Sequence, residues 1–191
     1  MKTIHALFAA TLWSLATVVS AADAPPDPPR EDTFTQDEVL AAANSIFGTV
    51  TEALAKAIER VLSDLGRPNA YIAGEEAGGA FTVGLRYGKG QMKLKNGYVQ
   101  RIYWQAPSIG FDVGGNASKV FTLVYNLRRT EDLFQRFPNV DGSAYFIAGV
   151  GVNYQRTAGI TLAPIRTGVG FRLGASIGYV HYTAKSTWLP F

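Results

Sequence analysis

The chain has 191 residues, a formal net charge of +3 and no cysteine. The lack of cysteine excludes disulfide bonds, thiol chemistry and cysteine-ligated metal centres. The positive charge is small and forms no basic run, which argues against a nucleic-acid-binding protein.

The first segment, residues 1–22, has the pattern of a secretory signal peptide. Lys2 supplies a positive end, an apolar stretch covers residues 4–19, and small residues follow. The apolar stretch is shorter than the ~20 residues that a membrane-spanning helix needs, so an uncleaved anchor is the less favoured alternative. Cleavage predicts that the chain is exported. Residues 23–34, rich in proline and charge, are expected to form an extended tether.

A long amphipathic helix is predicted over residues 35–65. Thr35 and Glu38 have the spacing of a capping box, apolar residues recur every three or four positions, and Gly66 marks the end. Gly48 lies within this stretch and leaves a bend or a split open. The polar face carries both signs of charge, which favours a helix packed on a sheet over one that binds a membrane surface or a partner.

From residue 70 onward, alternating side chains and turn signals predict strands. These are at 70–74, 80–88, 91–95, 98–104, 108–114, 119–126, 143–154, 159–173 and 176–183. Hairpin turns are predicted at residues 88–90 and 96–97. A short internal helix is predicted over residues 130–137, with Thr130 as its N-cap.

The longest alternation, residues 165–179, has bulky or uncharged residues at odd positions and glycine, arginine or serine at even ones. Successive strand side chains point to opposite faces, so this segment is a two-faced ribbon. Glycines gathered on one face indicate tight bending or close approach of another element. The expected fold is mainly β: a small closed or nearly closed antiparallel β-barrel, with the long N-terminal helix and one short internal helix, forming a single domain over residues 35–191.

Two orientations of such a barrel fit the pattern. In a water-soluble barrel the bulky face fills the interior, and the glycines lie outside, some of them beneath the long helix. In an outer-membrane barrel the bulky face meets lipid, and glycine, arginine and aspartate line a wet lumen. Lys185 and Thr187 occupy positions where the second arrangement needs apolar residues, so the water-soluble orientation is favoured.

The sequence carries no recognisable catalytic or metal-binding motif. His181 is the single histidine beyond the signal segment and cannot form a metal site alone. Glu75 and Glu76 are adjacent strand residues that face opposite ways, so they do not form an acid–base pair. We therefore predict no catalytic residues, no metal and no cofactor.

Four charged residues on the glycine face are the candidate ligand-binding residues: Arg86, Asp112, Arg166 and Arg172. A charged side chain that is buried needs a partner. In the functional interpretation, the arginines meet an anionic head group, a phosphate or a carboxylate, of a ligand. The alternative is a set of arginine–aspartate pairs on a solvated face.

Several short runs of sequence, spread over the chain beyond the tether, are together specific enough to identify a family, although no single run is. They lie at residues 66–69, 71–76, 84–88, 103–105, 107–112, 123–127, 140–145, 164–170 and 187–191. Together they resemble the EipA family of periplasmic envelope-integrity proteins. The resemblance implies a small periplasmic β-barrel needed for a sound cell envelope, with no known reaction. Residues 104–152 show a weaker likeness to the Ysc84/SYLF lipid-binding domains, which suggests an amphiphile as ligand.

The expected function is that of a non-enzymatic periplasmic factor that maintains cell-envelope integrity as a scaffold or binder. Its partner would be an envelope protein, lipid or glycan, with peripheral membrane contact left open and nucleic acid excluded. A carrier or sensor of an amphipathic envelope lipid or glycolipid is the first alternative, and it predicts an apolar cavity. A small outer-membrane barrel is the second. An enzyme acting on cell-wall glycan has the least support.

Overall fold

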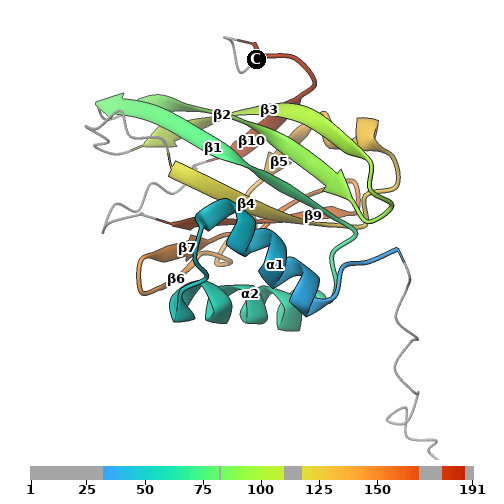
Figure 1. The fold of residues 1–191 in the computed structure, drawn as a ribbon. Coiled ribbons are helices and arrows are strands. Elements are labelled where there is room, and N and C mark those ends of the chain that lie inside the picture. Colours follow the sequence, from blue (N-terminus) through green and yellow to red (C-terminus); the bar gives the residue numbers. More distant parts are fainter. Residues whose placement is uncertain (1–31, 82, 110–117, 168–177, 188–191) are drawn as a thin grey trace, which may run out of the picture.

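The structure, a computed structural model, describes residues 32–81, 83–109, 118–167 and 178–187, which form two helices and a curved sheet (Figure 1). The helices are α1 (Gln36–Phe47) and α2 (Glu52–Leu65). The strands are β1 (Ala70–Phe81), β2 (Val83–Leu94), β3 (Val99–Ile109), β4 (Ser118–Tyr125), β5 (Arg136–Pro138), β6 (Tyr145–Ile147), β7 (Val150–Val152), β8 (Gln155–Thr157), β9 (Ile160–Thr167) and β10 (Tyr179–Thr183). The prediction of a mainly β fold is therefore confirmed.

The predicted single helix is two helices, and Gly48 separates them. Its φ of 82° is left-handed, a conformation that glycine adopts without the strain of a side chain and that ends a helix. Thr51 then caps α2 by accepting a hydrogen bond from the Leu54 amide. The capping box at the start of α1 is confirmed, because the Glu38 amide donates to Thr35 Oγ1 (3.3 Å) and the Thr35 amide donates to Glu38 Oε2 (2.8 Å).

The chain is already fixed to the domain just before α1. Phe34 is buried, and its amide donates to the Pro68 carbonyl at 2.8 Å. The Arg67 guanidinium donates to the carbonyls of Phe34 (3.1 Å) and Thr33 (3.0 Å). Thr33 and Phe34 are therefore part of the folded domain. They lie against Arg67 and Pro68, in the connection between α2 and β1.

The ten described strands form one antiparallel sheet in the order β5-β10-β3-β2-β1-β4-β9-β7-β6, with β8 paired to β9. The sheet curves strongly enough to be barrel-like. A single bridge between Asn139 and Gln155 connects the β5 side to the β8 side, and the Val140 amide donates to the Tyr154 carbonyl there. The β5 edge and the β8 edge of the sheet thus lie close together over a short stretch of backbone.

Two of the predicted local features need correction. The turn predicted at residues 88–90 is wrong: these residues lie within β2, where Gly88 pairs with Glu76 and Gly90 with Gly74. Gly88 and Gly90 fit this strand because the Trp104 ring at the first and the backbone of β1 at the second approach too closely for a Cβ. The internal helix is a single 3-10 turn, Thr130–Leu133, preceded by Arg129 without a side-chain cap. The turn at residues 96–97 is confirmed, with Gly97 at φ 89°.

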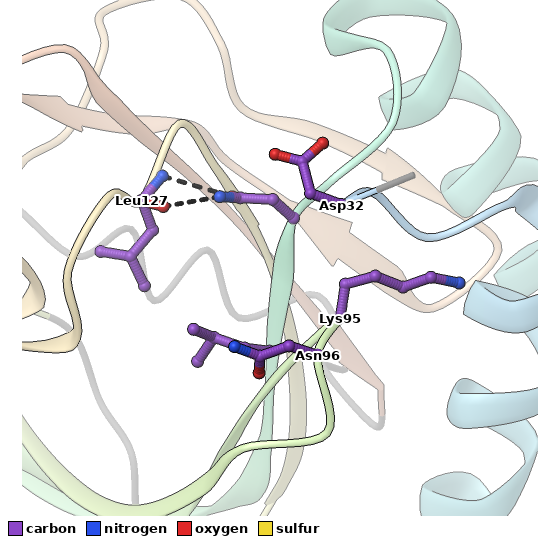
Figure 2. A pocket seen from close by; sticks show the side chains of 6 residues that line it. Asp32, Lys95, Asn96 and Leu127 are labelled. Carbon is purple, nitrogen blue, oxygen red and sulfur yellow. Dashed lines mark hydrogen bonds between the residues drawn. The ribbon is translucent and has the colours of Figure 1, made fainter. Parts of the chain in front are cut away.

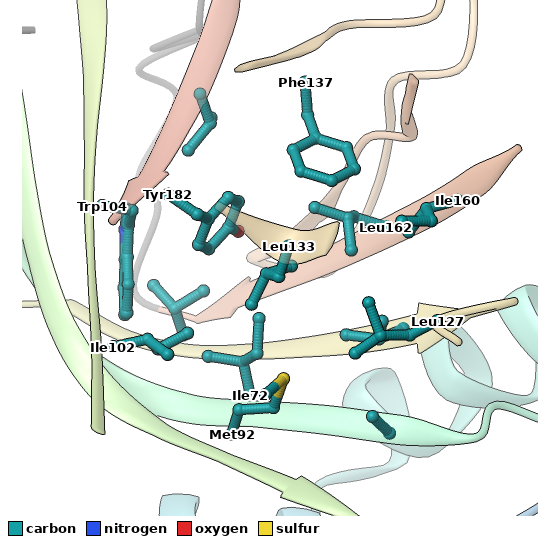
Figure 3. Packing of buried hydrophobic residues seen from close by; sticks show 14 of the residues in the cluster. Ile72, Met92, Ile102, Trp104, Leu127, Leu133, Phe137, Ile160, Leu162 and Tyr182 are labelled. Atoms are coloured by element: carbon teal, nitrogen blue, oxygen red, sulfur yellow. The ribbon is translucent and has the colours of Figure 1, made fainter. Parts of the chain in front are cut away.

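Buried apolar side chains fill the concave side of the sheet, which we call the inner core (Figure 3). Ile72, Met92, Ile102 and Leu162 come from four strands and are at most 1% exposed. In Figure 3, Trp104, Tyr182 and Phe137 close the inner core on another side. The ring centroids of Trp104 and Tyr182 are 6.0 Å apart, and those of Phe137 and Tyr182 are 5.8 Å apart.

A second cluster, the helix-side core, lies between the helices and the convex face of β4, β7 and β9 (Figure 1). Val39 of α1 and Ile58 of α2 are fully buried against Phe121, Leu123 and Ile165 of the sheet. The interpretation of the amphipathic segment as a layer packed on the sheet is therefore correct. No helix in the described ranges is both long and apolar enough to span a bilayer.

The predicted orientation of the two strand faces is wrong where the structure describes it. Ile165, from the bulky series, packs beneath the helices on the convex side, whereas Arg166 and Arg86 turn into the concave interior. Gly74 and Gly88 also face that interior, against the Trp104 ring. The reason is that the helices provide a second apolar layer outside the sheet, so bulky residues can be buried on either face.

Candidate functional site

The interior of the sheet contains a buried carboxylate that binds three donors from three other strands. Glu76 of β1 is 6% exposed. Its Oε1 accepts from Arg166 Nε at 2.7 Å and from Arg86 Nη1 at 3.3 Å, and its Oε2 accepts from Trp104 Nε1 at 3.2 Å. The two arginine side chains are themselves 12% and 11% exposed. We call Glu76, Arg86, Trp104 and Arg166 the Glu76 cluster.

Strand register explains how the Glu76 cluster forms. Glu76 pairs with Gly88 of β2, and Gly88 pairs in turn with Trp104 of β3. Because Gly88 has no side chain, the Trp104 indole lies over it and reaches the carboxylate; a Cβ at Gly88 would overlap the ring. Arg86 projects from the same face of β2. The glycine on this face therefore makes room for a side chain.

A network of amides extends the Glu76 cluster toward β8. Arg166 Nη1 donates to Asn153 Oδ1 at 2.9 Å, and Asn153 Nδ2 donates to Asn139 Oδ1 at 3.0 Å. Gln155, fully buried, donates to the same Asn139 oxygen at 3.4 Å. The charged cluster is thereby connected to the bridge that joins the β5 and β8 sides.

The electrostatics of the Glu76 cluster favour an ionised carboxylate. Burial on its own raises the pKa of Glu76, but the positive charges of Arg166 and Arg86, with the hydrogen bonds from Arg166 and Trp104, hold that pKa below its usual value. Burial also raises the pKa of the nearby Tyr182 hydroxyl to about 12.

The structure brings together half of the predicted ligand-binding set. Arg86 and Arg166 meet at Glu76, whereas Asp112 and Arg172 lie outside the described residues. Glu76 was not predicted as their partner. A usable signal existed, because Glu76 shares the even-numbered, glycine-bearing face of its strand with Gly74 and Gly78, as Arg86 does on the next strand.

The two adjacent glutamates face opposite ways, as predicted. Glu75 is exposed on the convex side and Glu76 is buried on the concave side. His181 lies on the outer face of β10, and burial with the nearby Arg136 charge lowers its pKa. Among the described residues, no three His, Asp or Glu side chains are grouped as metal ligands.

A polar depression lies at the opposite end of the sheet interior, around Asn69 and Leu127 (Figure 2). Asn69 bridges this rim, because its Nδ2 donates to the Leu127 carbonyl at 2.6 Å and its Oδ1 accepts from the Leu127 amide at 3.2 Å. One lobe has a volume of about 420 Å³ and a second about 930 Å³. We call this depression the rim groove; it is lined by Asp32, Asn69, Leu94, Lys95, Asn96, Asn126, Leu127, Arg128, Asp132, Gln135, Ala158, Gly159 and Ile160.

Some charged side chains of the rim groove are already paired. Lys95 Nζ bonds both carboxylate oxygens of Glu38, at 2.5 and 2.6 Å, and lies 5.2 Å from the centre of the Phe34 ring. The Lys95 hydrogen bond is the largest of the contacts that lower the pKa of Glu38 to about 2. Arg128, by contrast, is exposed and forms no ion pair among the described residues.

Comparison with known proteins gives the family. The model of the family described as "Envelope integrity protein A", or EipA, matches residues 32–191. The chain belongs to the EipA family. One similar solved structure is a crystal structure of a β-barrel-like, uncharacterized protein from Brucella abortus, which is 46% identical, covers 84% of this chain and 99% of that chain, and has a TM-score of 0.77.

None of the curated proteins compared with the chain matches it. The weaker likeness to the Ysc84/SYLF domains finds no support in these comparisons. The family name points to a role in envelope integrity, and no enzyme family is indicated.

Proposed function

We propose that this EipA-family chain is exported to the periplasm and supports envelope integrity by binding a partner, without catalysing a reaction. The Glu76 cluster is the observation that carries the second half of this proposal. The strongest candidate for acid–base chemistry is buried, held ionised, and engaged at both oxygens by fixed donors. Such a carboxylate serves to hold strands together rather than to exchange protons with a substrate.

The rim groove is the surface that we propose for partner binding. It combines amide side chains with charges of both signs, which suits a polar partner rather than an acyl chain. Apolar side chains occupy the inner core beneath it (Figure 3). We also infer that the sheet closes as a barrel through the Asn139–Gln155 bridge, which would make the rim groove the mouth of a filled structure.

A complementation experiment tests the groove. Arg128→Ala, which alters the groove lining, is expected to reduce rescue of envelope integrity in a strain deleted for this chain. Arg129→Ala is the matched control, because Arg129 is exposed, makes only surface ion pairs and does not line the groove. Equal rescue by both variants, at equal protein levels, would contradict binding at the groove.

Export has a separate test. The chain recovered from the periplasmic fraction is expected to begin within residues 22–25, as read by mass spectrometry of the intact protein. Recovery with residues 1–22 still attached would contradict cleavage, and recovery in the cytoplasm would contradict the proposed location.

A further inference from the structure

The outer face of β1, β2 and β3 lies away from the helices (Figure 1). Pleating places Lys89 and Lys93 of β2 on this convex side, since the intervening Met92 is buried in the inner core. Arg101 of β3 also lies there, next to the buried Ile102. All three basic residues are exposed.

Strand pairing holds these charges close together. Lys93 pairs with Val99, and Gln91, two residues along β2, pairs with Arg101. Neighbouring strands are ~4.8 Å apart, and four residues along a strand span ~13 Å, so the three positive groups share a small area. Glu75 of β1 pairs with Lys89, yet no ion pair forms between them within the described structure.

The basic side chains of α2, by contrast, form ion pairs with acidic residues of the same helix. Lys56 forms an ion pair with Glu52 at 2.6 Å, and Arg60 approaches Asp64 at 3.6 Å. The three basic groups on the sheet have no such partner among the described residues. The contrast indicates that the sheet face presents positive charge outward, whereas the helices neutralise theirs.

The hairpin that ends this face carries exposed apolar side chains. Tyr98 is 50% exposed and Val99 is 48% exposed, both at the turn between β2 and β3. Tyrosine favours the boundary between water and lipid, because its ring is apolar and its hydroxyl is polar. We call Lys89, Lys93, Tyr98, Val99 and Arg101 the basic face.

We propose that the basic face docks the chain onto the surface of a bilayer that contains anionic phospholipid. Lysine and arginine near such a surface each contribute about a fivefold gain in binding, and several together act within the short range of the surface potential. Tyr98 and Val99 would enter the head-group layer while the sheet stays outside it. The proposal requires that the chain meet an envelope membrane, and it does not depend on the rim groove.

Vesicle sedimentation of the chain as it is recovered after export tests the charges. At physiological salt the parent is expected to sediment with vesicles of phosphatidylcholine containing about one third phosphatidylglycerol, and not with phosphatidylcholine alone. Lys89→Gln/Lys93→Gln/Arg101→Gln should weaken this binding about a hundredfold. The control Lys56→Gln/Arg60→Gln/Arg129→Gln removes the same charge from exposed sites elsewhere and should bind like the parent.

The lack of cysteine allows a second measurement, with a dye at one introduced thiol. A polarity-sensitive dye on Tyr98→Cys should shift its emission to the blue when the phosphatidylglycerol vesicles are added. The same dye on Phe146→Cys, a site of similar exposure at 49% next to the helices, should not shift.

Three results would overturn the proposal. One is equal loss of vesicle binding in the two triple variants, which would mean that total charge alone matters. Another is a blue shift at both dye sites or at neither. The last is binding to a soluble anionic glycan, with no binding to vesicles, which would assign the basic face to a polysaccharide instead.

Discussion

The two ends of the sheet interior are built on opposite principles. At one end, beneath the rim groove, the side chains of Ile72, Met92 and Leu162 pack through apolar contacts, which have no required direction. At the other end the interior is filled by Glu76 and the donors that bind it. The same strands β1 and β2 contribute to both ends. The first end depends on the shape and volume of its side chains. The second end depends on hydrogen-bond donors placed at the two oxygens of one carboxylate.

The largest expected effect is removal of the buried carboxylate. Glu76→Ala leaves the Arg86 and Arg166 guanidinium groups buried without it, and should lower the free energy of unfolding by about 3–5 kcal/mol. Met92→Leu at the apolar end keeps the volume and should cost less than about 1.5 kcal/mol. Denaturant unfolding measures both, with the exposed Glu75→Ala as control. Similar losses for Glu76→Ala and Met92→Leu would erase the contrast between the ends.

The next effect concerns the space that Gly88 leaves for Trp104. Gly88→Ala puts a methyl group where the indole lies and should cost about 1–3 kcal/mol. In the background of Trp104→Leu, Gly88→Ala should cost less, because the ring that the methyl group would overlap is gone. Additive losses in this double-mutant cycle would show that the two positions act independently.

Acid should reveal the charged end as a dependence of stability on pH. The folded pKa of Glu76 lies below the ordinary value of 4.5, so the unfolded chain binds more protons as the pH falls through that value. The contribution of Glu76 is therefore complete above about pH 5 and is lost as the pH falls toward the folded pKa. Its share of the slope is at most about 1.4 kcal/mol per pH unit. Glu76→Gln should flatten the acid limb of the curve measured by denaturant unfolding, and an unchanged slope would count against an ionised, paired carboxylate.

The smallest effect is expected outside the interior, at the first helix. Thr35→Ala removes the cap of α1 and should cost about 1 kcal/mol in thermal unfolding. Thr130→Ala is the matched control, because Thr130 does not cap the 3-10 turn and its hydroxyl bonds only the exposed Glu131. A loss at Thr130 as large as that at Thr35 would contradict the assigned caps.

Local chemistry made several features predictable from the sequence. The Thr35–Glu38 capping box depends on residues three positions apart, and the turn at Asn96–Gly97 depends on two neighbours, so each can be read without the fold. The opposite orientation of Glu75 and Glu76 follows from pleating alone. These features need no knowledge of what lies across the sheet.

The features that were missed depend on contacts between distant residues. Alternation separates the two faces of a strand but does not say which is concave, and here both faces are buried where β4 and β9 pass beneath the helices. Gly48 ends a helix while Gly88 lies in a strand, and the difference is decided by the left-handed backbone at one and the Trp104 ring at the other. The pairing of Arg166 with Glu76 spans 90 positions of sequence.

The Glu76 cluster also constrains how this sequence can drift among relatives. A carboxylate that satisfies donors from three strands cannot be exchanged alone, since each single replacement leaves charges or a polar atom buried without compensation. Positions 76, 86, 104 and 166 should therefore be inherited as a group, together with the small residue at 88. Exposed residues of the rim groove, such as Asn96 and Arg128, can diversify one by one, so lineages could acquire different partners on an unchanged frame.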